Sequence, residues 1–275
     1  MLDKPHNIGN NAEDWDSVAS NWSNERYSSG PLAKHHRKVY LDLVQRWTDF
    51  NSVNCILKTD LFAEAFGPEL FLFDLAEING NIFAVDTSRE IVNKAIINAK
   101  DHKINTNGFL QADVRCLPFE NDKFDLIISD STLDHFSAKE DIFRSLAELT
   151  RVLKPGGTFI LTLDNKRNLT YPPYPLIRLW MKLRLSPYFI GRTLSLAELE
   201  QALEPLGMKI ITNTVILHLP HPDGLVRWVD KLASKTSKGR LDKPLFNAFC
   251  MLDKLEKLPT RSLTGRYLAI KAIKT

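Results

Sequence analysis

The pattern of apolar and polar residues is clearest in the middle of the chain. Residues 124–129 form a nearly continuous apolar run in which Asp125 is the only charge, and residues 158–163 form a second run rich in β-branched residues. Between the two runs, apolar residues recur at helical spacing and end at the helix-stopping sequence KPGG. Continuous apolar runs are typical of strands buried on both faces, as in parallel sheets. The pattern therefore predicts a strand, a crossover helix and a second, parallel strand.

Five further segments have the apolar patterns of strands, and helical patterns separate them. The other expected strands are residues 53–60, 81–86, 108–112, 208–217 and 265–273. The other expected helices are residues 12–27, 31–50, 68–78, 88–100, 196–206, 228–238 and 245–258. Strands that alternate with helices predict an α/β domain with a largely parallel sheet.

The composition is that of an ordinary globular protein and excludes several classes. Apolar residues make up 44% of the 275 residues and charged residues 25%, which excludes disorder over most of the chain. A net charge of +3 is too small to indicate a nucleic-acid partner without a basic patch that carries a recognition motif. Because no apolar run reaches the roughly 18 residues that span a bilayer, and the polar N-terminus lacks a signal-peptide core, we expect a cytoplasmic protein without a transmembrane segment.

The cysteines and histidines do not have the spacing of a local metal site. Cys55, Cys116 and Cys250 are far apart, and their odd number argues for a reducing compartment. His35 and His36 are adjacent on a predicted helix and do not face one ligand. We therefore predict no metal site.

Acidic residues stand where the predicted parallel strands end. Asp60, Asp86, Asp113 and Asp130 each close or follow a strand, and in parallel sheets the ligand crevice lies beyond the carboxyl ends of the strands. In nucleotide-binding folds, an acid at the end of the second strand accepts hydrogen bonds from the ribose hydroxyls, and Asp86 lies 26 residues after Asp60. The alternative is that Asp86 only caps the next helix, for which Ser88 is itself a good candidate.

The sequence FDLIISDSTLDHF, followed by ELTRVLKPGGTFILTL, resembles the fourth and fifth strands of class I S-adenosylmethionine-dependent methyltransferases, especially those that act on small molecules. The turn LKPGG that leads into a strand is a fairly specific mark of that family. The resemblance covers roughly residues 12–218 and 264–273. It implies a Rossmann-like, seven-stranded, mostly parallel sheet with an antiparallel last strand, helices on both faces and an N-terminal helical lid.

The resemblance also suggests how the chain is organised. Residues 1–50 would form an N-terminal tail and helical lid, because the sequence WDSVASNW resembles the family's N-terminal segment; the alternative is a helix that docks two tryptophans into a groove. Residues 51–275 would form the methyltransferase-like α/β domain, with insertions at about 166–194 and 220–262. The aromatic and basic segment 171–191 could roof the acceptor pocket or touch a membrane surface, and we favour the roof.

The first strand-to-helix loop departs from the family pattern, in which an acidic residue precedes alternating glycines. This chain has KTDLFAEAFG, with a single glycine. If Lys58 takes the acidic place, a like charge meets the ammonium of the methionyl group, and Asp60, Phe62 and Glu64 stand where glycines belong. If Asp60 takes it, the carboxylate is kept, Gly67 becomes the last glycine and the loop is one residue longer. We favour the second register because it preserves the charge pair.

The resemblance implies a set of cofactor-binding residues at the strand ends. They are Asp60, Gly67, Asp86, Thr87, Asp113, Val114 and Asp130. Asp60 would hold the ammonium of S-adenosylmethionine, Asp86 the ribose and Asp113 the adenine amine, while Val114 packs on the ring and Asp130 faces the methionyl group.

His135 is the candidate catalytic base, with Asp134 beside it as a second catalytic candidate; the alternative is a capping or packing histidine. We therefore expect an S-adenosylmethionine-dependent methyltransferase that methylates a small acceptor, which could be lipophilic, and releases S-adenosylhomocysteine. The alternative is a non-catalytic methyltransferase-like binding or partner subunit with a decayed cofactor loop. A nucleic-acid substrate is a weaker third hypothesis, and peripheral membrane contact is less favoured than a small-molecule acceptor.

Overall fold

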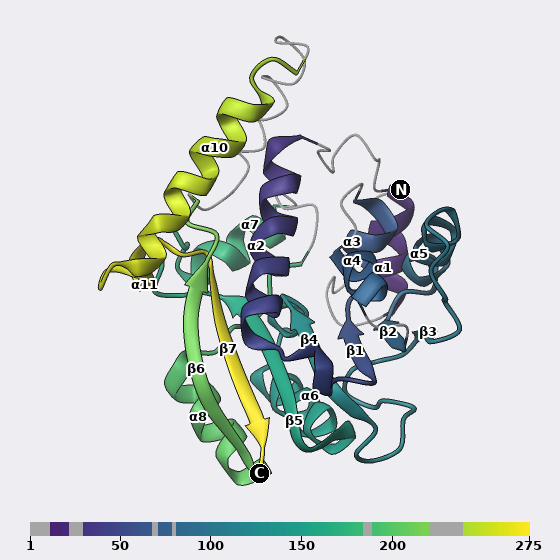
Figure 1. Ribbon diagram of the computed structural model, residues 1–275. Coiled ribbons are helices and arrows are strands. Elements are labelled where there is room, and N and C mark those ends of the chain that lie inside the picture. The colour runs from purple at the N-terminus through teal and green to yellow at the C-terminus, as the bar shows by residue number, and fades with distance from the viewer. Residues whose placement is uncertain (1–11, 22–29, 68–70, 79–80, 184–188, 220–238) are drawn as a thin grey trace, which may run out of the picture.

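Seven strands form one sheet within the residues that the computed structural model describes, which are 12–21, 30–67, 71–78, 81–183, 189–219 and 239–275 (Figure 1). The strands are β1 (Ile56–Thr59), β2 (Ile82–Asp86), β3 (Phe109–Gln111), β4 (Phe124–Asp130), β5 (Leu153–Asp164), β6 (Met208–Ile216) and β7 (Tyr267–Lys274). Their order across the sheet is β3-β2-β1-β4-β5-β7-β6.

The strand directions confirm the predicted architecture. β1 pairs in parallel with β2 and β4, β2 with β3, and β4 with β5. β7 is antiparallel to both of its neighbours, β5 and β6, so β6 runs in the same direction as the other strands. This is a Rossmann-like, mostly parallel sheet with an antiparallel last strand. The carboxyl ends of β1, β2, β3 and β4 therefore meet at one edge, where ligands bind in such sheets.

Apolar side chains are buried on both faces of the sheet, which explains why the strand sequences are continuous apolar runs. Along β1, Ile56 joins the core on one face and Leu57 the core on the other. The helices that cover the first face are α1 (Ala12–Asn21), α2 (Pro31–Trp47), α3 (Phe62–Phe66), α4 (Phe71–Ile78) and α5 (Arg89–Asp101). The second face is covered by α6 (Lys139–Val152) and α8 (Leu196–Leu203).

Local sequence signals set the ends of several helices. Ser88 caps α5 by accepting a hydrogen bond from the N–H of Ile91 at 3.2 Å. Ser195 and Glu198 form a capping box at the start of α8. The short helix α3 lies where the sequence predicts only a cofactor-binding loop.

Other predicted helices are matched in part. The helix predicted over residues 245–258 corresponds to α10 (Asp242–Leu252) and a 3-10 turn (Asp253–Lys257), and the aromatic and basic segment 171–191 contains α7 (Tyr174–Lys182). The short helix α11 (Arg261–Thr264) precedes β7. The helix predicted over residues 228–238 lies outside the described residues. Within the described part of the chain, no helix has both the length and the apolar character needed to cross a membrane.

The segment between β5 and α8 is fastened at both ends. At its beginning, the side-chain amide of Asn168 donates to the carbonyl of Gly265 at 3.0 Å. At its end, the N–H of Gly191 donates to the carbonyl of Asp134 at 2.9 Å. The backbones approach so closely here that a Cβ atom at Gly191 would lie 2.3 Å from the carbonyl oxygen of Phe136. Glycine is therefore required at position 191 if this contact is to form.

The packing of α6 against the second face of the sheet can be tested by substitution. Leu146 is fully buried, whereas Phe143 on the same helix is 41% exposed. We expect Leu146→Ala to lower the free energy of unfolding by about 2–5 kcal/mol, because it removes buried methyl groups and leaves a cavity. The matched control Phe143→Ala should change it by less than about 0.5 kcal/mol. Urea denaturation of both variants measures the difference, and equal losses would contradict the packing described here.

Candidate functional site

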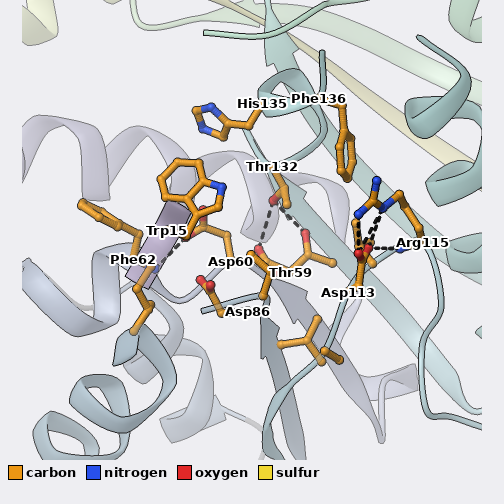
Figure 2. Close-up of a pocket in the computed structure, with 15 residues that line it drawn as sticks. Trp15, Thr59, Asp60, Phe62, Asp86, Asp113, Arg115, Thr132, His135 and Phe136 are labelled. Atoms are coloured by element: carbon orange, nitrogen blue, oxygen red, sulfur yellow. Dashed lines mark hydrogen bonds and ion pairs between the residues drawn. The ribbon is translucent and has the colours of Figure 1, made fainter. Parts of the chain in front are cut away.

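A cavity opens at the carboxyl ends of β1, β2, β3 and β4 (Figure 2). It encloses about 630 Å³, counting the part that is open to solvent. Its walls combine strand ends, the turn after β4 and residues of helices α1, α3 and α5. The lining residues are Trp15, Thr59, Asp60, Phe62, Val85, Asp86, Thr87, Ile91, Ala112, Asp113, Val114, Arg115, Thr132, His135 and Phe136.

Most of the residues proposed from the sequence lie in this cavity. Asp60, Asp86, Thr87, Asp113, Val114 and His135 line it. Gly67, Asp130 and Asp134 do not line it. The nine candidates therefore separate into six that face one space and three that serve other positions.

The side chain of Asp86, the last residue of β2, accepts hydrogen bonds from the backbones of two loops, one after β1 and one after β2. Its carboxylate accepts the N–H of Leu61 at 3.0 Å and the N–H of Ser88 at 2.8 Å. Burial and the nearby Asp60 raise the pKa of Asp86 to about 7. Each carboxylate oxygen has a further lone pair, so Asp86 keeps the capacity to accept hydrogen bonds from a ligand.

Asp60 has the backbone conformation that usually requires glycine. Its φ is +79°, and its carboxylate accepts the N–H of Phe62 at 2.7 Å. A left-handed residue at this place favours the register that we set aside, in which Lys58 takes the acidic position and Asp60 stands for the first glycine. Gly67 has a φ of −88° and ends α3, so it does not act as a glycine of the cavity loop.

Lys58 avoids a clash of like charges because its side chain turns away from the cavity into a buried ion cluster. The ammonium lies 3.1 Å from Glu64 and 3.3 Å from Asp130, and it donates to the carbonyl of Asp60 at 2.7 Å. Burial alone would lower the pKa of Lys58, but Asp130, Glu64 and Asp60 together raise it. We call Lys58, Glu64 and Asp130 the ion cluster.

The ion cluster explains why Asp130 does not reach the cavity. Its carboxylate points to Lys58, so the role in which it faces the methionyl group has no support from this geometry. Burial, together with Asp60 and Glu64, raises the pKa of Asp130 to about 7 in spite of the attraction of Lys58. The second oxygen of Glu64 accepts the N–H of Leu72 at 3.1 Å, which links the ion cluster to α4.

Asp113 follows β3 and is paired with Arg115. The guanidinium of Arg115 donates to both oxygens of Asp113 and also to Asp141 at 3.1 Å. Burial would raise the pKa of Asp113, but its hydrogen bonds to Arg115 outweigh burial and lower it. Arg115 has no signal in the sequence, because only the folded chain shows that its side chain returns to Asp113, two positions earlier.

His135 lies at the cavity mouth, where its ring meets Trp15 of α1 edge to face with centroids 5.0 Å apart (Figure 2). Its Nδ1 is 2.8 Å from the carbonyl oxygen of Phe189. A carbonyl can only accept, so Nδ1 carries the proton and Nε2 carries the lone pair of the neutral ring. This is the tautomer that a general base needs.

Asp134 does not orient His135. It is 3% exposed, and its carboxylate accepts the hydroxyl of Ser131 at 3.0 Å and the N–H of Asp164 at 2.8 Å. These bonds join the turn after β4 to the end of β5. Asp134 therefore belongs to the scaffold of the site, and we do not retain its expected catalytic role.

Of the aromatic residues Trp15 and Phe62 in the cavity, the sequence indicates a role at the site only for Trp15. Trp15 comes from the helix that the sequence analysis interpreted as a lid, and Phe62 occupies a place in the loop where the family has a glycine. Their rings lie 6.5 Å apart in an edge-to-face arrangement. Together with His135 they narrow the cavity on the side opposite to Asp113 (Figure 2).

The ion cluster generates a stability prediction. We expect Lys58→Met to lower the free energy of unfolding by about 3–5 kcal/mol at neutral pH, because it leaves two buried carboxylates without their cation. The matched control Lys38→Met removes a lysine that pairs with Asp42 on the surface of α2, and it should cost less than about 1 kcal/mol. Urea denaturation compares the two variants. A loss no larger for Lys58 than for Lys38 would show that the ion cluster is not a major stabilising interaction.

Comparisons with known proteins agree with the fold. A family model described as a methyltransferase domain matches residues 67–183. A 2-phytyl-1,4-naphtoquinone methyltransferase from Nostoc punctiforme is 28% identical over 58% of this chain and 65% of its own length. A geranyl diphosphate C-methyltransferase from Streptomyces coelicolor A3(2) has a TM-score of 0.54 at 14% identity, covering 86% of this chain and 77% of its own. The cyclase SpnF has a TM-score of 0.55 at 20% identity, covering 86% and 79%.

The sequence relatives and the solved structures support different conclusions. The curated relatives are matched over only 10% to 65% of their own length, so their activities do not transfer as a whole. The two solved structures show the fold alone, and one of them is a cyclase. The methyltransferase-domain match and the order and directions of the seven strands described here nevertheless agree. The chain therefore has the fold of class I S-adenosylmethionine-dependent methyltransferases, and residues 67–183 match a methyltransferase-domain model.

Proposed function

We propose that this protein is an S-adenosylmethionine-dependent methyltransferase that acts on a small acceptor. The observation that carries the proposal is the charge of the cavity. Lys58 is balanced by Glu64 and Asp130, which leaves Asp60 and Asp86 at the cavity without an ion pair among the described residues. Two carboxylates without a cation suit a ligand that brings positive charge, and the sulfonium and ammonium groups of S-adenosylmethionine bring it.

The chemistry of the walls also fits this ligand. Apolar side chains of Val85, Ile91, Ala112 and Val114 line the part of the cavity near β2 and β3, where an adenine ring would pack. Asp86, with Thr87 beside it, would accept hydrogen bonds from the ribose hydroxyls. The carboxylate position at the end of the second strand is the one that nucleotide-binding α/β folds use for a ribose.

The remaining cofactor contacts differ from the family pattern. Asp60 would attract the methionyl ammonium, taking over the role expected of the acidic residue while keeping the conformation of a glycine. Asp113 would accept the adenine amine through the lone pairs that Arg115 leaves on its oxygens. Gly67, Asp130 and Asp134 are not part of the proposal.

The methyl donor supplies an electrophilic methyl group on a sulfonium, so the protein has to align the acceptor and remove its proton. Nε2 of His135 would take the proton, because Nδ1 is held as a donor to the carbonyl of Phe189. Trp15 and Phe62 would exclude water from the side at which the acceptor enters. The quinone methyltransferase among the relatives supports a small, lipophilic acceptor.

A second candidate function is a non-catalytic binding subunit. The observation that favours it is the filled loop: Phe62 replaces a glycine at the cavity, and Arg115 covers the carboxylate of Asp113. The structure of a methyltransferase from Haloferax volcanii with the Trm112 activator, which has a TM-score of 0.56 at 18% identity, is an example of this fold in a complex. Calorimetry with S-adenosylmethionine and S-adenosylhomocysteine distinguishes the two candidates, because a filled site binds neither.

The first prediction from this proposal concerns Asp86. We expect Asp86→Ala to weaken the binding of S-adenosylhomocysteine by about 1–3 kcal/mol, because the hydrogen bonds from the ribose hydroxyls to a carboxylate are lost. Asp101→Ala at the exposed end of α5 should leave affinity unchanged. Calorimetry measures both variants, and circular dichroism checks that each remains folded. If the wild-type protein binds neither form of the cofactor at millimolar concentration, the methyltransferase proposal is wrong.

The second prediction concerns pH. The pKa of Asp86 is raised to about 7, chiefly by burial, so this carboxyl group is mostly neutral at pH 6 and mostly ionised at pH 8. The ribose hydroxyls donate to the ionised carboxylate, so affinity for S-adenosylmethionine should rise with pH, by at most about tenfold per unit for one titrating group, and level off above pH 7. S-Adenosylhomocysteine has the same ribose and should show a similar rise. Calorimetry of both ligands across this range tests the prediction, and affinities that do not change between pH 6 and pH 8 would argue against a contact between Asp86 and the ligand.

A further inference from the structure

A second group of side chains with metal-binding chemistry lies between α2 and α10. His35 comes from α2, Cys250 from α10 and Asp253 from the 3-10 turn that continues α10. One ligand atom from each residue lies within 4.8 Å of the other two. Cys250 and Asp253 are three positions apart and so share one face of the helical segment, turned toward His35.

This group is separate from the cavity of the proposed methyltransferase site. α10 packs against α2 on the far side of the molecule from α1 and α3 (Figure 1). Cys250 and Asp253 line a second cavity with His218 and Glu256, and this cavity shares no lining residue with the first. It encloses about 1070 Å³, counting its open part. The inference below therefore does not depend on the proposed function.

The polar atoms of this region are poorly satisfied. His35 is fully buried against the ring of Phe249, and its Nε2 lies 2.7 Å from Oδ2 of Asp253. Within the described residues, Nδ1 of His35, Oδ1 of Asp253 and Nε2 of His218 are buried and have no hydrogen-bond partner. Buried polar atoms without partners are costly and uncommon, so those of His35 and Asp253, whose side chains contact each other, need an explanation.

Among the described residues, the neighbouring cations Lys38 and Arg46 are paired with other carboxylates and do not pair with Asp253. Lys38 pairs with Asp42, and Arg46 pairs with Glu256 at 3.1 Å. Asp253 is thus left to His35, with the thiol of Cys250 beside both. A cation held by all three residues would satisfy the carboxylate, the imidazole and the sulfur together.

We propose that His35, Cys250 and Asp253 bind one divalent transition-metal ion, of which Zn²⁺ is the best match. One nitrogen, one sulfur and one carboxylate oxygen are all ligands that Zn²⁺ takes, whereas the thiolate and imidazole disfavour Mg²⁺ and Ca²⁺. On binding, the S–H bond of Cys250 breaks, its proton goes to solvent and a sulfur–metal bond forms. The three residues leave the fourth position of a tetrahedral ion toward the second cavity.

The ion would fasten the C-terminal helix α10 onto α2. Local sequence spacing does not reveal this site, because His35 and Asp253 are 218 positions apart in the chain. The contacts between α2 and α10 include the ring of His35 against Phe249 and an apolar cluster in which Leu32 and Phe249 pack with Leu219 and Leu245. A metal bridge would add three strong bonds to this packing.

Zinc titration of the full-length, reduced protein against a chromophoric chelator tests the proposal. We expect one Zn²⁺ per chain, with affinity at least about tenfold weaker in Cys250→Ser and in Asp253→Asn. Cys116→Ser is the matched control, since Cys116 is exposed and lies outside the cluster, and it should bind as the wild type does. Circular dichroism establishes that each variant is folded, and both altered ligands are partly exposed and conservatively replaced.

Two further readouts separate coordination from a merely structural effect. Co²⁺ should give a thiolate-to-metal charge-transfer band in the wild type and Cys116→Ser but not in Cys250→Ser. Zn²⁺ should slow the alkylation of Cys250 while leaving that of Cys116 unchanged, and it should raise the melting temperature. Absence of zinc binding by the wild type at micromolar concentration would overturn the proposal, as would binding that survives Cys250→Ser and is lost in Cys116→Ser.

Discussion

The buried ammonium of Lys58 is the interaction on which the ligand-binding edge of the sheet depends. It lies on β1, is fully buried, and reaches Asp130 at the end of β4 and Glu64 in α3. Through Glu64 it also joins the N-terminus of α4. A buried ammonium is stable only when carboxylates or carbonyls pair with it, so the loop after β1 has to place Glu64 beside Lys58.

That arrangement orders a loop that lacks the glycines of the family pattern. Asp60 adopts the left-handed conformation that glycine usually supplies, and Lys58 pairs with Glu64 and Asp130 outside the cavity. The loop is therefore held by ion pairs within the protein. A pocket that is already ordered loses less conformational entropy when a ligand binds.

Much of the fold was predictable because the signals are local. Continuous apolar runs identify strands buried on two faces, and the acids Asp60 and Asp86 follow from the rule that ligands bind beyond strand ends. The contact partner of a long or polar side chain could not be predicted from local sequence. Asp130 turns to Lys58, Asp134 turns to Ser131, and Arg115 turns back to Asp113, because each finds its partner only in the folded chain. The contact of His35 with Asp253 has no local signal at all.

The segment between β5 and α8 is attached at two points, through Asn168 to Gly265 and through Gly191 to Asp134. The second attachment tolerates no side chain, so the chain must return to the same point beside His135 whatever lies between. Between the attachments, the carbonyl of Phe189 contacts Nδ1 of His135, and Ile177 of α7 is buried. A substitution in this stretch therefore leaves His135 in place only if it preserves both attachments and the backbone position of Phe189.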